Sequence, residues 1–165
     1  MTATNPFSAR GKVDQIGIVV RDIEEAMRRY AALLGIGGWL GYRFGPGTLG
    51  VSTYRGEPGR YEILLAIAGS RPQVELIQPL RGPSIFDEHL AAHGEGLHHL
   101  GLYVRGLERA VAALTADGFE VIQSGGRYPG RERGGYAYFE TRRELGLLAE
   151  LIEWPETPLE TAFTG

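Results

Sequence analysis

The chain has 165 residues, of which 43% are hydrophobic and 22% are charged, as expected for one globular domain or two closely paired halves. Its net charge of −3 and its lack of long apolar runs argue against nucleic-acid or membrane partners. The chain contains no cysteine, which excludes disulfides, thiolate catalysis and cysteine-ligated zinc, and we expect a cytoplasmic protein.

The first half begins with a strand and a helix. Residues 1–10 have neither a basic start nor an apolar run, so we expect a flexible tail rather than a secretion signal. Residues 13–20 alternate in polarity, which predicts a strand. Residues 23–34 show helical spacing between Asp22, a suitable N-cap, and Gly35, a suitable stop. Glycine and proline then separate four strand-like segments, 39–44, 48–54, 60–68 and 73–78.

The same pattern recurs 84 positions later. Residues 97–104 repeat the first strand, and a helix beginning at Leu107 and ending at Asp117 repeats the first helix. Residues 84–93 predict a capped helix between the halves. Strand-like segments follow at 119–124, 135–140 and 147–153.

This repeat predicts an α+β fold of two paired βαβββ modules that form a curved, half-open sheet around a cleft. Each module would need its twin to bury an open sheet face. The expected boundaries are a tail over 1–10, modules over 11–80 and 96–155, a connecting helix over 81–95, and a C-terminal tail over 156–165.

Four polar side chains occupy matching positions in the two halves. Glu75 and Glu150 lie between apolar residues in the closing strands, while Gln15 and His99 match on the first strands. Alone, each has an ordinary explanation as a solvated strand residue or a core histidine. Two buried carboxylates at equivalent positions, however, favour a shared cation. Three oxygens and one imidazole nitrogen suit one divalent ion such as Zn, Ni, Co, Mn or Mg.

We expect the other three histidines to lie outside the metal site. Strand alternation places His98 on the face opposite to His99, in a structural or half-exposed position. His89 and His93 are spaced to share a helix face and could in principle bind a metal. The carboxylate of the metalloprotease pattern is missing between them, so we interpret them as a helix surface.

Three arginines, Arg127, Arg131 and Arg133, lie close together in a glycine-rich stretch. They form either a solvated loop or a clamp for the anionic part of a small-molecule substrate.

The doubled pattern VDQIGIVVRDIEEAMRRYAALLGI and LHHLGLYVRGLERAVAALTADGF, with the closing segments VELIQPL and LLAELIEWP, resembles the vicinal oxygen chelate superfamily. This superfamily includes glyoxalase I, methylmalonyl-CoA epimerases, extradiol dioxygenases and bleomycin-resistance proteins. The resemblance covers nearly everything from Val13 to Pro155. The segment QVELIQPLRGPSIFDEHLAAHGEGLHHLGLYV is most similar to the epimerases.

The resemblance implies that the four metal positions of the family fall on Gln15, Glu75, His99 and Glu150. Epimerases of this group usually have histidine where this chain has Gln15. Glutamine in this position is familiar from eukaryotic-type glyoxalase I, and it replaces a histidine that the iron dioxygenases use, which argues against oxygen chemistry.

The resemblance also implies proton transfer at the carbon beside a metal-bound carbonyl. Glu150 is the first candidate for the base. Glu62 is the second, because it lies near a position that is acidic in some epimerases, and its other interpretation is an exposed strand carboxylate. We expect an epimerase or isomerase acting on an acyl-CoA or a polyhydroxy ketone. A glyoxalase-type lyase and a non-catalytic small-molecule binder are alternatives, and relatives often form homodimers.

Overall fold

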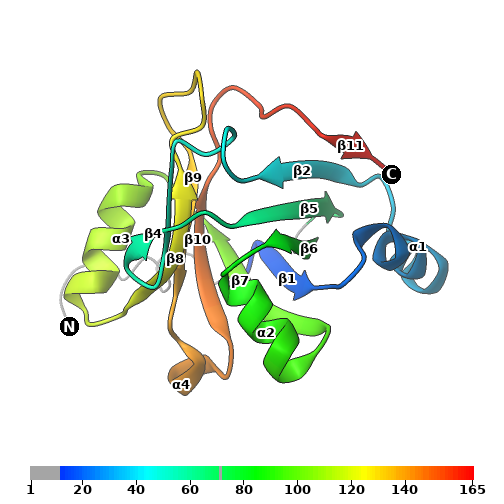
Figure 1. The fold of residues 1–165 in the computed structure, drawn as a ribbon, viewed down its shortest axis with the longest axis horizontal. Helices are drawn as coiled ribbons and strands as arrows, with labels where there is room; N and C mark the ends of the chain where they lie inside the picture. The colour runs from blue at the N-terminus through cyan, green and yellow to red at the C-terminus, as the bar shows by residue number, and fades with distance from the viewer. Residues whose placement is uncertain (1–11, 71) are drawn as a thin grey trace.

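The computed structural model describes residues 12–70 and 72–165 (Figure 1), so the tail expected over residues 1–10 lies outside the described residues. The first half contains β1 (Gln15–Val19), α1 (Ile23–Leu34), β2 (Leu40–Phe44), β3 (Val51–Tyr54), β4 (Glu57–Pro58), β5 (Glu62–Ala68) and β6 (Gln73–Arg81). The remaining elements are α2 (Ile85–His93), β7 (Gly96–Tyr103), α3 (Leu107–Ala116), β8 (Val121–Gly126), β9 (Gly135–Phe139), α4 (Arg142–Leu145), β10 (Leu148–Glu153) and β11 (Phe163–Thr164).

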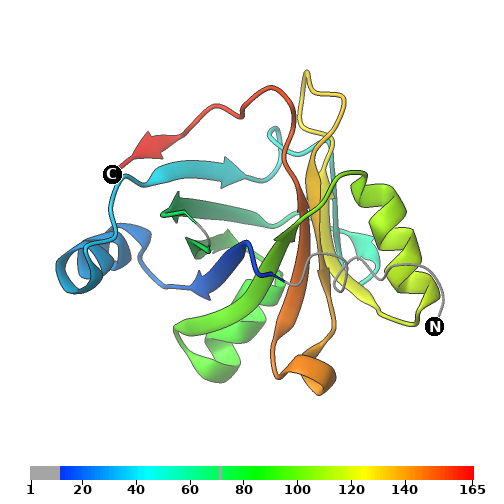
Figure 2. The same cartoon turned by 180° about the vertical axis from the view of Figure 1, so that it is seen from behind.

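All strands of the described residues belong to one sheet with the order β11-β2-β5-β6-β1-β7-β10-β9-β8-β3-β4. The first strands of the two halves, β1 and β7, lie side by side and antiparallel at its centre. Each pairs in parallel with the closing strand of its own half, β1 with β6 and β7 with β10. The sheet curls into a half-open barrel, as Figures 1 and 2 show. The predicted α+β fold of two paired modules around a curved sheet is therefore confirmed.

Each half extends the sheet of the other. The β3–β4 hairpin comes from the first half, yet β3 pairs with β8 at the far edge of the second half. In return, β11 at the C-terminus pairs with β2 of the first half. Local polarity predicted a strand over residues 48–54 and a tail over residues 156–165, but it carries no information about these distant partners.

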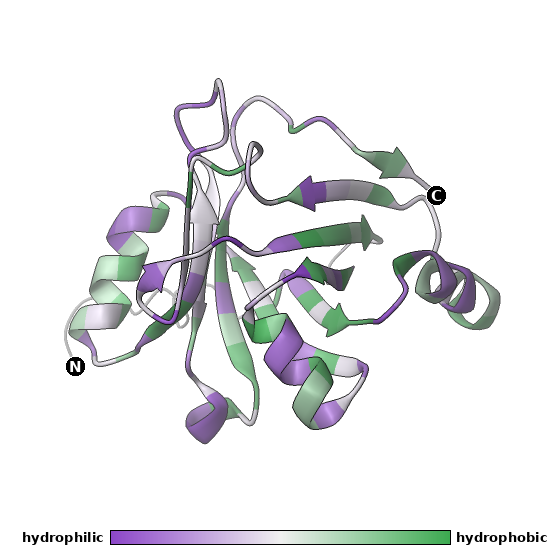
Figure 3. Cartoon of the chain, viewed as in Figure 1, coloured by the Kyte–Doolittle hydropathy of each residue, from purple (hydrophilic) through white to green (hydrophobic). Residues whose placement is uncertain are grey.

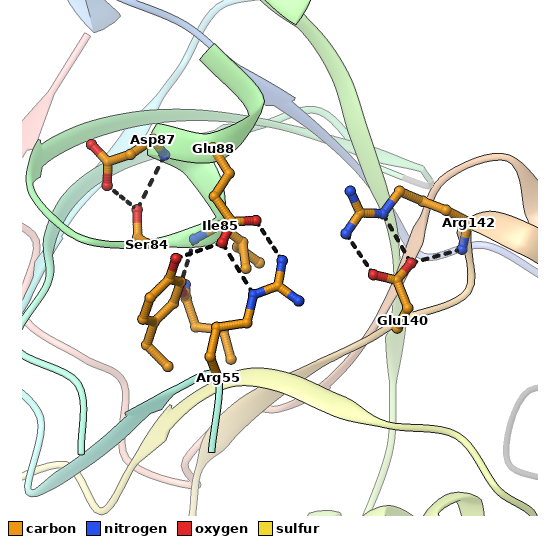
Figure 4. A network of polar contacts seen from close by, with 9 residues as sticks. Arg55, Ser84, Ile85, Asp87, Glu88, Glu140 and Arg142 are labelled. Atoms are coloured by element: carbon orange, nitrogen blue, oxygen red, sulfur yellow. Dashed lines mark hydrogen bonds and ion pairs between the residues drawn. The ribbon is translucent and has the colours of Figure 1, made fainter. Parts of the chain in front are cut away.

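The connecting helix α2 is fixed to the β3–β4 hairpin by ionic contacts, shown in Figure 4. Glu88 on α2 accepts hydrogen bonds from Arg55 Nε at 3.1 Å and Arg55 Nη2 at 2.5 Å. The hydroxyl of Tyr54 donates to the same carboxylate at 2.5 Å. Ser84 caps the helix by accepting from the backbone N–H of Asp87. The hairpin therefore links the edge of the second half to the helix that joins the halves.

The apolar residues form three buried clusters, one inside the curled sheet and one beneath each of α1 and α3. Helix α1 starts at the predicted N-cap Asp22, which accepts from the N–H of Glu25, and stops at Gly35 with a φ of 68°. Helix α2 contributes Ile85 and Phe86 to the inner cluster. Figure 3 shows mainly hydrophobic residues along β5, which contributes to the core, and hydrophilic residues in α4. In the described part of the chain, none of the helices combines the length and the apolar character needed to cross a lipid bilayer.

Candidate metal centre

Glu75, His99 and Glu150 converge from strands β6, β7 and β10 near the centre of the sheet. One potential ligand atom of each lies within 4.8 Å of the others. The Nε2 atom of His99 is 3.0 Å from Glu150 Oε2 and 3.3 Å from Glu75 Oε2. None of the three residues is more than 4% exposed. The fold therefore brings together carboxylates that are 75 positions apart in the sequence.

Gln15 reaches the same place from β1. It is 1% exposed and lines one pocket together with Glu75 and Glu150. The pocket has a volume of about 20 Å³, enough for roughly one water molecule or ion. Three of the four predicted ligands thus line one small space, and His99 contacts two of them.

The residues fit a divalent metal ion. Among the described residues, Gln15 Oε1 and Nε2, Glu75 Oε2, His99 Nε2 and Glu150 Oε2 are buried without a hydrogen-bond partner. The two contacts of His99 Nε2 are close but lack hydrogen-bond geometry. A buried polar atom without a partner costs about 1–3 kcal/mol, and one cation would satisfy an atom from each of the four residues. Oxygen and imidazole donors are those that borderline and hard divalent ions accept.

The charges of the cluster are strongly coupled. Burial and the charge of Glu150 raise the pKa of Glu75 to about 7, although the contact with His99 lowers it. Burial alone would lower the pKa of His99, but the carboxylates of Glu150 and Glu75 outweigh burial and raise it to about 9. Without a cation, the cluster therefore retains protons at neutral pH that a metal ion would displace.

Aromatic side chains form the walls of the pocket. Its lining includes Phe44, Trp154, and the three tyrosines Tyr128, Tyr136 and Tyr138. Burial raises the pKa of both Tyr136 and Tyr138 well above the usual value for tyrosine, so both phenols keep their protons. We did not predict these residues. The alternation of GYAYF in β9 could have indicated that Tyr136 and Tyr138 share a face.

A hydrogen-bond chain orients one of these phenols. Tyr61 donates its hydroxyl proton to the carbonyl oxygen of Ser124 at 2.6 Å. Its oxygen lies 2.9 Å from the hydroxyl of Tyr136, which therefore donates to it. Tyr136 is thereby fixed in the pocket wall.

His98 lies beside His99, contrary to the prediction from strand alternation. In the pairing of β1 with β7, Gly17 is opposite His99 and Ile18 is opposite Leu97, so His98 is the extra residue of a β-bulge. The Nδ1 atoms of His98 and His99 are 3.0 Å apart. Burial and the neighbouring His99 hold the pKa of His98 well below its usual value. The prediction of opposite faces was wrong because alternation assumes a regular strand.

Glu62, the second candidate for the base, is not brought to this pocket. Ile63 and Leu65 line the pocket from β5, and Glu62 lies outside its lining. The carboxylate of Glu62 instead accepts from Arg43, with 2.6 Å to Nε and 2.5 Å to Nη2. The structure therefore places Glu62 in a partly exposed ion pair between β5 and β2.

The predicted arginine clamp is divided. Arg131 donates to the carbonyl oxygens of Pro129 at 3.0 Å and Pro158 at 2.7 Å, and more weakly to that of Thr157 at 3.4 Å. Arg127 and Arg133 are exposed. Arg131 lines a second pocket of about 320 Å³, which shares Phe44 and Tyr128 with the small pocket. Of the three arginines, Arg131 is thus the one that lines this second pocket.

A sequence profile described as the Glyoxalase/Bleomycin resistance protein/Dioxygenase superfamily matches residues 14–139. An uncharacterized protein of Bacillus subtilis, YqjC, is 29% identical over 144 residues, which cover 86% of this chain and 91% of that protein.

Several solved structures share the fold. The hypothetical protein BH1468 from Bacillus halodurans has a TM-score of 0.58 and 23% identity, with 90% of this chain and 98% of that chain covered. Methylmalonyl-CoA epimerase from Mycobacterium tuberculosis also has a TM-score of 0.58 and 23% identity, with 97% and 94% covered. A methylmalonyl-CoA epimerase from Streptomyces coelicolor in complex with 2-nitronate-propionyl-CoA has a TM-score of 0.57 and 21% identity, with 86% and 96% covered. At these identities the likeness establishes the fold alone.

Proposed function

The chain belongs to the glyoxalase/bleomycin resistance protein/dioxygenase superfamily, and from this premise we propose that it is a metal-dependent epimerase or isomerase that removes a proton beside a metal-chelated carbonyl. One observation carries the proposal. Gln15, Glu75 and Glu150 line one small pocket, His99 contacts both carboxylates, and all four side chains have buried polar atoms without a hydrogen-bond partner in residues 12–70 and 72–165.

A divalent ion held by these four side chains would supply Lewis acidity that stabilises an enolate oxygen. Glu150 is the proposed base, because its Oε2 lies in the pocket and is free of hydrogen bonds within the described chain. Glu62 lies outside the pocket lining and is held by Arg43, so its position favours the assignment to Glu150. The protonated phenol of Tyr138 can donate a hydrogen bond to a substrate oxygen, while the other aromatic walls, including Tyr136, exclude water.

The substrate class is a small molecule with two neighbouring oxygens, such as an acyl-CoA or a polyhydroxy ketone. Solved epimerases of this fold were determined in complex with methylmalonyl-CoA and with 2-nitronate-propionyl-CoA. The pocket of about 320 Å³ adjoining the cluster offers space for a longer substrate, and Arg131 at its wall suits an anionic part. Arg127 and Arg133 are exposed and lie close to Arg131 in the sequence. We propose that they also contact the anionic part of the substrate. The proposal also includes a homodimeric state and a cytoplasmic location for the enzyme.

Gln15 supports a second candidate function. Glutamine in this position is familiar from eukaryotic-type glyoxalase I, so a lyase of that kind would use the same four ligands. A non-catalytic binder remains the third alternative, and it would bind its ligand without needing the metal.

The test combines metal analysis with solvent exchange. We expect about one divalent ion per chain, and metal-dependent exchange of the α-proton with deuterium when methylmalonyl-CoA or polyhydroxy ketones are followed by NMR. Glu150→Gln should abolish the exchange, whereas the matched variant Glu62→Gln should retain it. Exchange that persists after chelation would contradict the proposal. Tight ligand binding without metal and without exchange would favour the binder.

A further inference from the structure

His98 contacts the proposed metal ligand His99 through a ring nitrogen. Their Nδ1 atoms are 3.0 Å apart, and His98 and His99 are 5% and 0% exposed. Neighbouring residues of a regular strand would point to opposite faces. The bulge between β1 and β7 therefore supplies His99 with a buried partner next to it in sequence.

A second contact of His98 determines which ring donates. His98 hydrogen-bonds the backbone of Ile85 at the start of α2. The N–H of Ile85 already donates to Gln123 Oε1 at 3.0 Å, so the carbonyl oxygen accepts from His98. Because Nδ1 of His98 faces His99, the nitrogen that donates to Ile85 is Nε2.

A neutral imidazole carries one N–H, so the Nδ1 of His98 holds a lone pair. The short contact between the two Nδ1 atoms is then a hydrogen bond in which His99 donates. When His99 is neutral, its own lone pair is on Nε2, the atom that lies 3.0 Å from Glu150 and 3.3 Å from Glu75. This is the tautomer that metal binding through Nε2 requires.

The packing around His98 holds its ring in place. Its ring centroid lies 5.1 Å from that of Phe86 on α2 and 6.1 Å from that of Tyr138 on β9. Helix α2 and strand β9 thus hold the His98 ring, whose Nδ1 accepts the hydrogen bond from His99.

We propose that His98 is a positioning residue that holds His99 in its Nδ1–H tautomer and orients its Nε2 toward the metal site. Ligating histidines usually donate their second nitrogen to a carboxylate, a carbonyl or a water, and here a buried histidine takes that place. The inference rests on the proposed function in one respect, the binding of a divalent ion by the cluster.

The test compares His98→Leu with His98→Asn. Leucine fills a similar volume without an acceptor, whereas the amide oxygen of asparagine can lie near the position of Nδ1. Zinc affinity is measured by competition with a chromophoric chelator. We expect His98→Leu to weaken zinc binding about 10- to 100-fold, and His98→Asn to restore most of the loss. The chain has four histidines, so a ¹⁵N-histidine NMR spectrum of the zinc-loaded protein is simple to assign. The Nδ1–H of His99 should be protected from exchange in the native and His98→Asn proteins, and lose this protection in His98→Leu.

Unchanged zinc affinity and an unchanged Nδ1–H signal in His98→Leu would overturn the inference. Thermal unfolding of the metal-free variants checks that they fold. If His98→Leu does not fold, His98→Gln replaces it, because its amide oxygen lies near the position of Nε2 and leaves Nδ1 of His99 without an acceptor. If the native chain takes up no zinc, the proposed function fails. The contact with His98 is still tested then, by comparing the protection of the His99 Nδ1–H from exchange in the metal-free native, His98→Leu and His98→Asn proteins.

Discussion

Two glycines make room for the four proposed ligands. Gly17 on β1 is the register partner of both Glu75 and His99. Gly101 on β7 is the partner of both Gln15 and Glu150. Each first strand therefore carries a glycine at the register position between two of the proposed ligands.

Gly17→Ala should disrupt the cluster. A Cβ at Gly17 would lie 1.8 Å from Cε1 of His99, and the other ring atoms are also too close, so the ring would have to move. We expect a loss of stability of about 1–3 kcal/mol together with much weaker metal binding. Thermal unfolding of the metal-free protein and a metal titration would measure the two effects.

Gly101→Ala is a milder comparison for Gly17→Ala. Its Cβ would meet Cδ1 of Ile152 at 2.9 Å, from which the flexible side chain can rotate away, and Cβ and Oε1 of Gln15 at 3.0 and 3.1 Å, so only Gln15 among the proposed ligands would have to shift slightly. We expect a smaller effect on metal binding from this change. Native metal affinity in the Gly17→Ala protein would refute the steric argument.

At the scale of elements, the segment from Pro155 to Ala162 runs from β10 to β11 and returns the chain to the first half (Figure 1). Arg131 donates to two carbonyl oxygens of this segment, and Leu159 packs against the inner core. Arg131 and Leu159 also line the pocket of about 320 Å³ beside the cluster. The segment thus forms one side of the pocket proposed to hold a longer substrate.

Arg131→Ala should loosen this segment without unfolding the protein. The change removes side-chain hydrogen bonds to Thr157 and Pro158, while the pairing of β11 with β2 remains. Hydrogen exchange followed by mass spectrometry should show faster exchange in peptides covering residues 155–162 and little change in β7 or β10. Arg133→Ala, which changes an exposed neighbour, should leave these peptides unaffected. Equal exchange in both variants would mean that Arg131 does not hold the segment.

The sequence predicted the positions of helices and strands better than it predicted which strands pair with one another. Periodicity and capping located α1 between Asp22 and Gly35, because a helix is determined by nearby residues. The internal repeat identified Gln15, Glu75, His99 and Glu150 as equivalent positions, and the structure gathers them. The place of the β3–β4 hairpin on β8 and the bulge at His98 could not be predicted, because both depend on pairing with strands far away in the sequence.

On the scale of the whole molecule, the cluster lies where the halves meet. Gln15 and Glu75 come from the first half, and His99 and Glu150 come from the second. β1 and β7 join the halves by direct pairing at this point. A cation bound by all four would therefore stabilise the contact between the halves as well as the site.

The metal-free protein should lose stability as the pH rises from about 7 to about 9. The folded state raises the pKa of Glu75 to about 7 and that of His99 to about 9, so it binds more protons than the unfolded chain over this range. Both contributions are complete below the unfolded pKa values and are lost as the pH passes the folded ones. The lowered pKa values of His98 and His89 have the opposite effect, but only below about pH 6.5, and those of Glu88 and Glu140 act at still lower pH.

Urea unfolding at a series of pH values, with a chelator and then with saturating zinc or manganese, would measure this dependence. The added ion should remove the fall in the free energy of unfolding with rising pH, because the ion replaces the protons as the partner of the carboxylates. Constant or rising stability of the metal-free protein over the window would contradict the coupling within the cluster.

The exchange of edge strands has a consequence for any attempt to divide the protein. A fragment ending at Arg81 would retain the β3–β4 hairpin without the β8 edge on which it lies, and β2 would lose its neighbour β11. The complementary fragment would be deprived of both Gln15 and Glu75. The two pieces, although each repeats the other's plan, are therefore expected to fold and to assemble a site only when they are present together.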